Sequence, residues 1–229
     1  MLKPKIKEIF SSVQGEGIYV GQPQIFIRFA GCNLDCAYCD TKKSGGKNYS
    51  PFEIVRKVGQ VNSSNAIDTI SITGGEPLLY PDFLLSLLPR LRIKNFKMYL
   101  ETNGTLPSGF EKIRDFIDIV AMDMKMPTAS SAKAFWGRHR DFLRLAVKKR
   151  VFVKIVITPK TTIDEIKKAI AIIDDIDCGI PLVLQPVTPA KRVARKAPLG
   201  RLLEFQTLAM TLLGDVRIVP QVHKILGVQ

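Results

Sequence analysis

Seven short segments rich in apolar and β-branched residues recur along the chain, and each predicts a β-strand. Several are nearly continuous hydrophobic runs, which is typical of parallel strands covered by other elements on both faces. The predicted strands are residues 24–30, 69–73, 97–101, 117–122, 151–158, 182–187 and 216–219.

Helix signals lie between these strands. Ser50 is followed three residues later by Glu53, and Thr162 by Glu165 in the same way. This is the spacing of a capping box, in which both side chains satisfy free backbone N–H groups at the start of a helix. The predicted helices are residues 51–59, 81–92, 133–150 and 198–213, with one more that starts after Thr162.

Strands that alternate with helices indicate βα units and a parallel sheet, which is an α/β fold. About six such units are too few for a closed eight-unit barrel, which usually takes about 250 residues. We therefore expect one domain, residues 1–229, folded as a partial, open (β/α)6-type TIM barrel. Ligands of such folds bind at the C-terminal ends of the strands.

Composition narrows the class of protein. Hydrophobic residues make up 46% of the 229 residues and charged residues 24%, which excludes wholesale disorder. No apolar run reaches the roughly 18 residues that span a bilayer. The basic N-terminal residues are not followed by the apolar segment of a signal peptide. We expect a cytoplasmic protein with no membrane partner.

The charge is strongly positive, since 34 Lys and Arg stand against 21 Asp and Glu, a net charge of +13. This excess suggests anionic ligands or acidic partners. The basic residues are dispersed, however, which favours solvated helix faces. Trp136 beside the run Arg138-His139-Arg140 could contact nucleic acid, but a solvated helix start is the favoured interpretation, and we expect no nucleic-acid partner.

Cysteine placement is more informative. Three of the four cysteines, Cys32, Cys36 and Cys39, lie on the predicted loop after the strand 24–30. A tight triplet indicates a metal or cluster site rather than a disulfide framework. Structural zinc usually has four protein ligands, so three thiolates favour a [4Fe–4S] cluster with one iron open to another ligand. Cys178 is a distant fourth candidate, and a buried bystander thiol is the favoured interpretation.

The motif Cys32-x3-Cys36-x2-Cys39, with Tyr38 before the last cysteine, resembles the radical S-adenosylmethionine superfamily. Gly74-Gly75-Glu76-Pro77, after the second parallel strand, resembles the segment of that superfamily that contacts the methionine amino group. The resemblance implies a [4Fe–4S] cluster held by the three cysteines and S-adenosylmethionine bound to its open iron.

The N-terminal segment 8–17 (EIFSSVQGEG) narrows the resemblance to the family of 7-carboxy-7-deazaguanine synthases. Segments 26–32, 39–41, 101–105, 185–186 and 218–224 match the same family in order. The family implies a carbon–nitrogen lyase that converts 6-carboxy-5,6,7,8-tetrahydropterin to 7-carboxy-7-deazaguanine with loss of ammonia, in queuosine- or archaeosine-type 7-deazapurine biosynthesis. It also implies Mg²⁺ as a cofactor and a homodimer.

Residue roles are carried over from this resemblance. Thr41 is the implied Mg²⁺ ligand, and the segment 214–229 is the implied closing segment over the site, after the cluster loop 31–41. The implied S-adenosylmethionine contacts are Tyr38, Cys39, Asp40, Gly75, Glu76, Asp123, Met124, Lys125 and Gln185. The implied substrate contacts are Val13, Gln14, Gly15, Glu16, Arg28, Thr73 and Gln229.

Three of these side chains also suit their roles chemically. The Gln14 amide can pair with the donor and acceptor edge of a pterin, and the Glu16 carboxylate can accept from its amino groups. Arg28 can bind the substrate carboxylate through its planar guanidinium. The alternatives are a polar, glycine-flanked turn for Gln14 and Glu16, and a structural salt bridge for Arg28.

Two other functions remain open from the residues. One is a glycyl-radical-enzyme activating enzyme, which would use the same cysteine loop on a protein substrate. The other is a basic iron–sulfur or zinc protein that binds RNA without catalysis. The basic surface also suggests docking of an acidic electron donor such as flavodoxin.

Overall fold

The computed structural model describes residues 4–39, 44–64, 66–130 and 134–228. These residues form one nine-stranded sheet in the order β3-β1-β2-β4-β5-β6-β7-β8-β9. The strands are β1 Lys5–Val13, β2 Pro23–Phe29, β3 Lys47–Asn48, β4 Thr69–Gly74, β5 Lys97–Thr102, β6 Ile119–Asp123, β7 Arg150–Ile157, β8 Leu182–Pro186 and β9 Val216–Ile218.

β2 and β4 to β9 pair in this order, and every pair among them is parallel. At one edge of the described sheet, β1 pairs antiparallel with both β2 and β3, so β1 runs opposite to the other strands. The other edge is β9, which does not return to pair with β3, so the predicted open, partial barrel is confirmed. The register places Arg28 opposite Thr73 and Asp123 opposite Lys154, close to the C-terminal ends of these strands.

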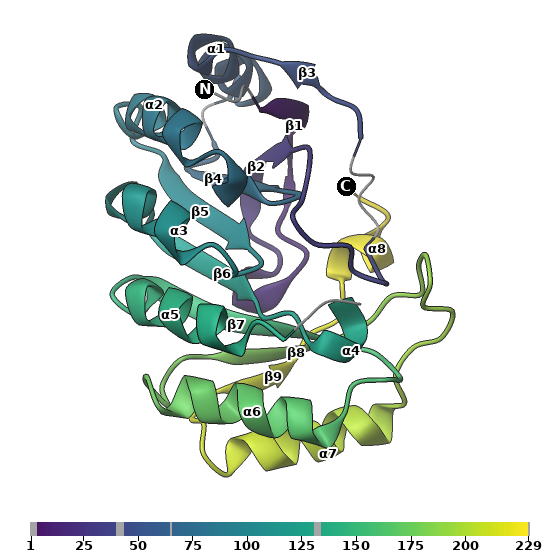
Figure 1. The fold of residues 1–229 in the computed structure, drawn as a ribbon. Coiled ribbons are helices and arrows are strands. Elements are labelled where there is room, and N and C mark those ends of the chain that lie inside the picture. Colours follow the sequence, from purple (N-terminus) through teal and green to yellow (C-terminus); the bar gives the residue numbers. More distant parts are fainter. Residues whose placement is uncertain (1–3, 40–43, 65, 131–133, 229) are drawn as a thin grey trace.

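The longer helices of the described chain cover the outer face of the curved sheet (Figure 1). The loops that build the site gather at the C-terminal ends of the parallel strands. The outer helices are α1 Pro51–Val61, α2 Pro81–Arg92, α3 Pro107–Ile113, α5 Trp136–Ala146, α6 Ile163–Asp174 and α7 Leu199–Met210, and the shorter ones are α4 Pro127–Ser130, α8 Val222–Leu226 and the 3₁₀ turns Gly17–Tyr19, Pro77–Leu79 and Arg114–Phe116.

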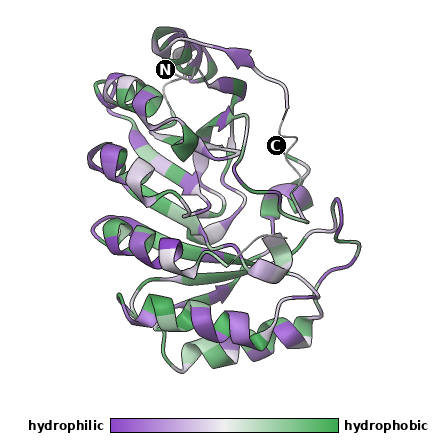
Figure 2. Ribbon diagram, in the orientation of Figure 1, coloured by the Kyte–Doolittle hydropathy of each residue, from purple (hydrophilic) through white to green (hydrophobic). Residues whose placement is uncertain are grey.

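The main core lies between the outer helices and the sheet. Figure 2 shows strands that are mostly hydrophobic and helices that are striped, with one apolar side. Side chains that face the helices, such as Ile72, Leu100 and Leu184, are fully buried there, so the close-packed helices support the sheet from its outer face. A smaller cluster, which includes Tyr99 and Phe152, covers part of the inner face.

All seven predicted strands are confirmed, and so are both capping boxes, at Ser50 and Thr162. The prediction for 133–150 is too long, because the helix described there ends at Ala146 and the chain turns into β7 at Arg150. Among the described elements, the sequence prediction missed β1, β3, α3, α4 and α8. Nowhere in the described ranges does a helix combine the length and the apolarity needed to cross a membrane.

Candidate active site at the C-terminal edge of the sheet

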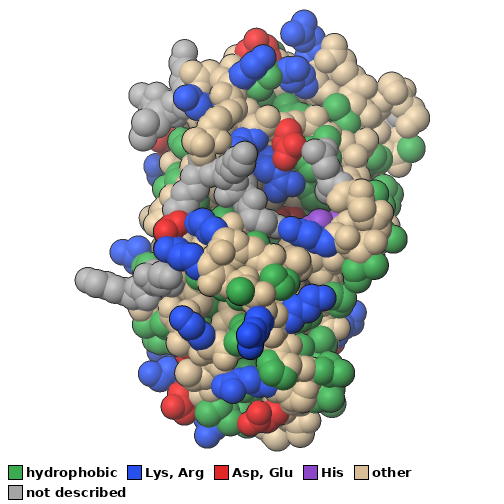
Figure 3. Space-filling model, turned by 90° about the vertical axis from the view of Figure 1, so that its right-hand side faces the viewer, with side chains coloured by type: hydrophobic (Ala, Val, Ile, Leu, Met, Phe, Trp, Pro, Cys, Tyr) green, Lys and Arg blue, Asp and Glu red, His purple; other side chains and the backbone are tan. Residues whose placement is uncertain are grey.

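A cavity of about 510 Å³ opens at the C-terminal ends of the parallel strands. This volume suits a small-molecule ligand. Figure 3 looks onto this side of the molecule, where Lys and Arg side chains (blue) are spread over the surface. The predicted site residues that line the cavity are Val13, Gln14, Gly15, Glu16, Arg28, Cys32, Cys36, Tyr38, Cys39, Thr73, Gly75, Asp123, Lys125 and Gln185.

Five predicted residues stand apart from that set. Asp40, Thr41 and Gln229 lie outside the described residues. Met124 is fully buried in the main core and does not line the cavity. Glu76 is also fully buried and does not line it.

The cysteine loop leaves β2 and places all three thiols along one wall of the cavity. Cys36 is buried, and Cys32 and Cys39 are half-buried. Burial raises the pKa of the Cys32 thiol, so the protein alone disfavours the thiolate that binds metals. Within the described ranges, no group of three His, Cys, Asp or Glu side chains is arranged to hold a metal ion in the protein alone, and this applies to the three thiols as well.

The expectation that Cys178 is a buried thiol is wrong. The thiol is exposed rather than buried, in the turn between α6 and β8. That turn precedes β8, so it lies at the N-terminal edge of the sheet, whereas the cavity lies at the C-terminal edge. The donor set facing the cavity therefore has three thiols and fits a cluster with one iron left for another ligand.

The backbone of the glycine-rich segment docks directly on the cysteine loop. Gly75 N–H donates to the carbonyl of Phe29 at 2.9 Å, and Glu76 N–H donates to that of Gly31 at 2.9 Å. A Cβ at Gly75 would lie 1.7 Å from the Gly31 oxygen, so only glycine fits. This approach fixes the floor of the cavity beside the thiols.

The Glu76 side chain points away from the cavity and links two strand ends. Its carboxylate accepts hydrogen bonds from the Thr102 hydroxyl (2.9 Å) and from the backbone N–H groups of Leu78 (3.0 Å) and Asn103 (2.8 Å). Burial raises its pKa to about 7. The geometry thus gives the side chain an internal role, and the predicted contact of Glu76 with S-adenosylmethionine stays a prediction.

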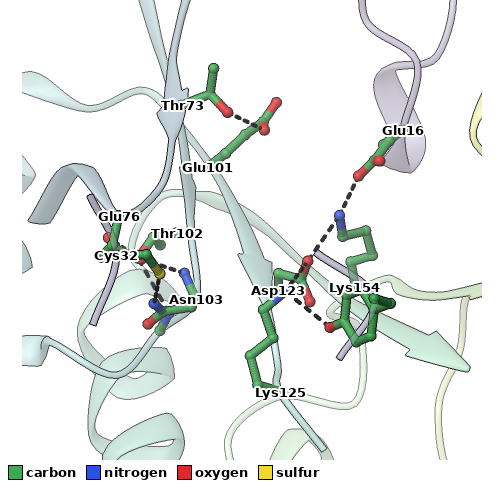
Figure 4. Close-up of polar contacts among 12 residues, drawn as sticks. Glu16, Cys32, Thr73, Glu76, Glu101, Thr102, Asn103, Asp123, Lys125 and Lys154 are labelled. Atoms are coloured by element: carbon green, nitrogen blue, oxygen red, sulfur yellow. Dashed lines mark hydrogen bonds and ion pairs between the residues drawn. The ribbon is translucent and has the colours of Figure 1, made fainter. Parts of the chain in front are cut away.

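A chain of charged groups crosses the other side of the cavity (Figure 4). Lys154 pairs with Glu16 and, at 3.0 Å, with Asp123. Lys125 pairs with Asp123 at 2.8 Å and donates to the Tyr38 hydroxyl at 3.1 Å. The chain therefore connects the N-terminal loop to the cysteine loop through β6 and β7.

These contacts determine the ionisation states of the two carboxylates and the two lysines. Burial disfavours ionisation of Glu16, but Lys154 beside it lowers its pKa to about 2. The two lysines likewise outweigh burial and lower the pKa of Asp123. Both lysines have raised pKa values, since their carboxylate neighbours outweigh the cost of burial. All four groups are therefore ionised at neutral pH.

Gln14 and Thr73 meet at a carboxylate that the sequence prediction did not assign. Glu101, at the end of β5, accepts from Gln14 Nε2 at 2.9 Å, from the Thr73 hydroxyl at 2.6 Å and from the Ser71 hydroxyl at 3.2 Å. Gln14 Oε1 accepts from the Glu16 N–H at 3.0 Å. The contacts predicted for substrate thus form one connected polar wall.

The position of Arg28 is compatible with both interpretations, a structural salt bridge and a cation for the substrate carboxylate. Its Nε lies 2.5 Å from Glu8 Oε1, and its guanidinium lies 5.5 Å from the centre of the Phe10 ring. The salt bridge expected as the alternative is therefore present. The side chain is also a quarter exposed and lines the cavity, where an anionic ligand can reach it.

The C-terminal segment packs against the N-terminal loop. Val222 N–H donates to the Gly15 carbonyl at 2.9 Å, and Gln221 Nε2 donates to Glu16 at 2.6 Å. The ring of His223 lies so close that a Cβ at Gly15 would be 2.1 Å from its Nδ1. This segment therefore forms one wall of the cavity.

The expectation of a solvated helix start is wrong for His139. Its flanking residues Arg138 and Arg140 are exposed, as a solvated helix start predicts, but the imidazole is fully buried. Its Nε2 lies 3.2 Å from the Asn103 carbonyl, and burial lowers its pKa to about 4. This neutral, internal histidine is unsuited to contact with nucleic acid.

Comparison with known proteins identifies the family of the chain. A sequence model of the radical SAM superfamily matches residues 26–173. The 7-carboxy-7-deazaguanine synthase of Geobacter sulfurreducens is 41% identical over 252 aligned residues, which cover 99% of this chain and 99% of that protein. The synthase of Methanothermobacter thermautotrophicus is 35% identical, with 100% of this chain and 99% of that protein covered. The chain belongs to the 7-carboxy-7-deazaguanine synthase family of radical SAM enzymes.

Solved structures share the fold of this family. QueE from Escherichia coli aligns with a TM-score of 0.65 and 21% identity, with 97% of this chain and 96% of that chain covered. Streptococcus suis SuiB bound to S-adenosylmethionine aligns with a TM-score of 0.61 and 16% identity, over 83% of this chain and 48% of that chain. Membership of the radical SAM family implies a [4Fe–4S] cluster and S-adenosylmethionine, and the three thiols on the cavity wall suit this cluster.

Proposed function

We propose that this chain converts 6-carboxy-5,6,7,8-tetrahydropterin to 7-carboxy-7-deazaguanine with loss of ammonia, a step of 7-deazapurine biosynthesis. The observation that carries the proposal is the convergence of the cysteine loop, Gly75 and the Gln14–Glu101–Thr73 wall on one cavity. When bound, the reduced cluster and S-adenosylmethionine together supply a carbon-centred radical that abstracts a hydrogen atom from the substrate.

The cofactor side of the cavity offers acceptors for S-adenosylmethionine. Within the described residues, Asp123 Oδ1 and Gln185 Oε1 are buried without a hydrogen-bond partner. A buried acceptor without a donor is costly, and the hydroxyl and amino groups of S-adenosylmethionine can satisfy both. Lys125 places a positive charge beside Asp123, which suits the carboxylate of the methionine portion.

The substrate side offers groups of matching polarity. Glu16 and Glu101 are acceptors for the amino and ring N–H groups of a pterin. The Gln14 amide and the Thr73 hydroxyl, which bond to Glu101 in the protein alone, can exchange these bonds for bonds to the substrate. Arg28 supplies the cation for the substrate carboxylate. The side chains hold and orient the pterin, and its ring chemistry follows the hydrogen abstraction.

Further parts of the proposal rest on the family. Mg²⁺ would bind Thr41 together with substrate oxygens, since Mg²⁺ prefers oxygen ligands and retains waters. The proposal also includes a homodimer, a cytoplasmic location and an acidic electron donor such as flavodoxin.

The net charge of +13 supports the acidic donor, since opposite charges speed association at low salt. Reduction by flavodoxin should slow as salt rises, and turnover should fall after chelation of Mg²⁺.

An anaerobic turnover assay tests the proposal. Reconstituted protein is mixed with the carboxytetrahydropterin, S-adenosylmethionine, Mg²⁺ and a chemical reductant, and the product is identified by mass. Carboxydeazaguanine is the expected product. Formation of 5′-deoxyadenosine alone would show a radical enzyme with another substrate, such as a glycyl-radical protein. Colourless protein that holds zinc would show a non-catalytic metal site.

A further inference from the structure

A network of mostly buried polar side chains lies directly behind the cysteine loop, at the end of β5 (Figure 4). Its centre is Asn103, which is 5% exposed. Thr102, Thr105 and Glu76 beside it are also buried, and so is His139. Buried polar groups of this kind remain ordered only if nearly all of them are hydrogen-bonded.

The backbone of Asn103 is fixed from two directions. Its N–H donates to Glu76 Oε2 at 2.8 Å. Its carbonyl lies 3.2 Å from Nε2 of His139, a histidine whose lowered pKa keeps it neutral. The loop that follows β5 is therefore held by the glycine-rich segment on one side and by α5 on the other.

The side-chain amide of Asn103 is fixed as well. Its Oδ1 accepts from the N–H of Thr105 at 3.0 Å and from the Thr105 hydroxyl at 2.5 Å. The backbone N–H can only donate, so the oxygen of the amide must face Thr105 and the nitrogen must face the cysteine loop. There Nδ2 donates to Asn33 Oδ1 at 2.9 Å and lies 3.9 Å from Cys32 Sγ.

Asn33 closes the network, because its own Nδ2 donates to the Thr105 hydroxyl at 2.8 Å. The residue next to Cys32 is thereby tied to the β5 loop. Cys32 Sγ also accepts from the N–H of Leu34 at 3.4 Å. A distance of 3.9 Å is long for a hydrogen bond, but the second N–H of the Asn103 amide has this sulfur as its neighbour.

We propose that Asn103 is a positioning residue for the iron–sulfur cluster, which orients the Cys32 sulfur and directs an N–H dipole at it. Glu76 acts indirectly, by holding the backbone of Asn103. Hydrogen bonds to the ligating sulfurs are among the factors that set the reduction potential of a cluster. A donor stabilises the more negative, reduced state, so Asn103 raises the potential and eases the electron transfer on which turnover depends.

The test compares the same substitution at two buried asparagines. Asn103→Asp keeps the size and the acceptor for Thr105 but removes the donor that faces Cys32. Asn62→Asp is the matched control. Asn62 is 4% exposed, with bonds to the backbone of Ile67, and it caps the end of α1 far from the thiols. Both chains are reconstituted, and iron content and the midpoint potential of the cluster are measured by EPR-monitored titration.

We expect the midpoint potential of Asn103→Asp to shift to more negative values, while Asn62→Asp keeps that of the wild type. Loss of iron from a folded Asn103→Asp chain, with iron retained by Asn62→Asp, also supports the proposal. Asn103→Asp also adds a negative charge near the sulfur. Asn103→Ser, which is uncharged and too short to reach the sulfur, must therefore shift the potential in the same direction.

A full complement of iron and an unchanged potential in the Asn103 variant would overturn the proposal. It rests on the cluster of the proposed function but not on the substrate. A wild-type chain that holds the cluster and makes no carboxydeazaguanine would refute the proposed reaction alone, and the comparison of potentials would still decide the role of Asn103.

Discussion

Lys154 and Glu16 form an ion pair at the cavity, although they are 138 positions apart in the chain. Lys154 comes from β7, and Glu16 comes from the loop after β1. The same ammonium group lies 3.0 Å from Asp123 on β6. One lysine thus holds together the loop proposed to bind substrate and the carboxylate proposed to bind S-adenosylmethionine.

Removal of this lysine should affect both folding and substrate binding. Lys154→Met leaves two mostly buried carboxylates without their shared cation, and breaking such a pair costs about 3 kcal/mol or more. We expect a free energy of unfolding lower by about that amount, measured with urea, and a raised KM for the pterin because Glu16 is no longer held. Lys148→Met, at an exposed position, should change stability by no more than about 0.5 kcal/mol.

Substitution of Gly75 should disrupt the floor of the cavity. The added Cβ of Gly75→Ala would overlap the Gly31 oxygen, so the glycine-rich segment must move away from the cysteine loop. We expect weaker binding of S-adenosylmethionine and a lower iron content after reconstitution. Gly59→Ala in α1 is the control, since nothing lies within 4 Å of its added Cβ. That change should stabilise the helix by up to about 1 kcal/mol. Equal S-adenosylmethionine binding by both variants would contradict this account.

Loss of the Arg28 guanidinium should separate substrate binding from cofactor cleavage. Arg28→Ala removes the cation proposed for the substrate carboxylate, and a hydrogen bond to a charged group contributes roughly 2 kcal/mol. The KM for the pterin should rise about tenfold or more, while formation of 5′-deoxyadenosine without substrate persists. Arg56→Ala, on the exposed side of α1, is the control. An unchanged KM in Arg28→Ala would remove Arg28 from this role.

The fold was predictable because its signals are local. Runs of β-branched residues mark the parallel strands, and the capping boxes at Ser50 and Thr162 mark two helix starts. β1 was missed because its sequence, KIKEIFSSV, mixes polar and apolar positions, as expected of a strand near a sheet edge.

The site was predictable only where residue type reveals chemistry. The thiols and Arg28 stand out in the sequence. Lys154 could have been found by the argument used for Arg28, since it is a charge within an apolar strand, VFVKIVI. Glu101 and Asn103 could not, because their importance lies in partners from distant segments. His139 was misjudged, since two exposed arginines beside it conceal its burial.

The last prediction concerns the pH dependence of stability. Two buried groups of the network behind the cysteine loop have pKa values that are shifted in opposite directions. The pKa of Glu76 is raised to about 7, so the folded state binds its proton more tightly than the unfolded state, and its contribution to stability is lost as pH rises from about 4.5 to 7. The pKa of His139 is lowered to about 4, so its contribution is lost as pH falls from about 6.5 to 4.

Each effect amounts to about 3 kcal/mol over its window. In the wild type the two nearly cancel between about pH 4.5 and 6.5, and single variants should expose them. Relative to the wild type at the same pH, Glu76→Gln should gain stability as pH rises and His139→Gln should gain stability as pH falls. Urea unfolding at pH 5, 6 and 7 measures both differences, and the comparison at equal pH cancels the other titrating groups. If neither variant's difference in free energy of unfolding from the wild type changes with pH, the pKa values of Glu76 and His139 are not shifted by burial as described here.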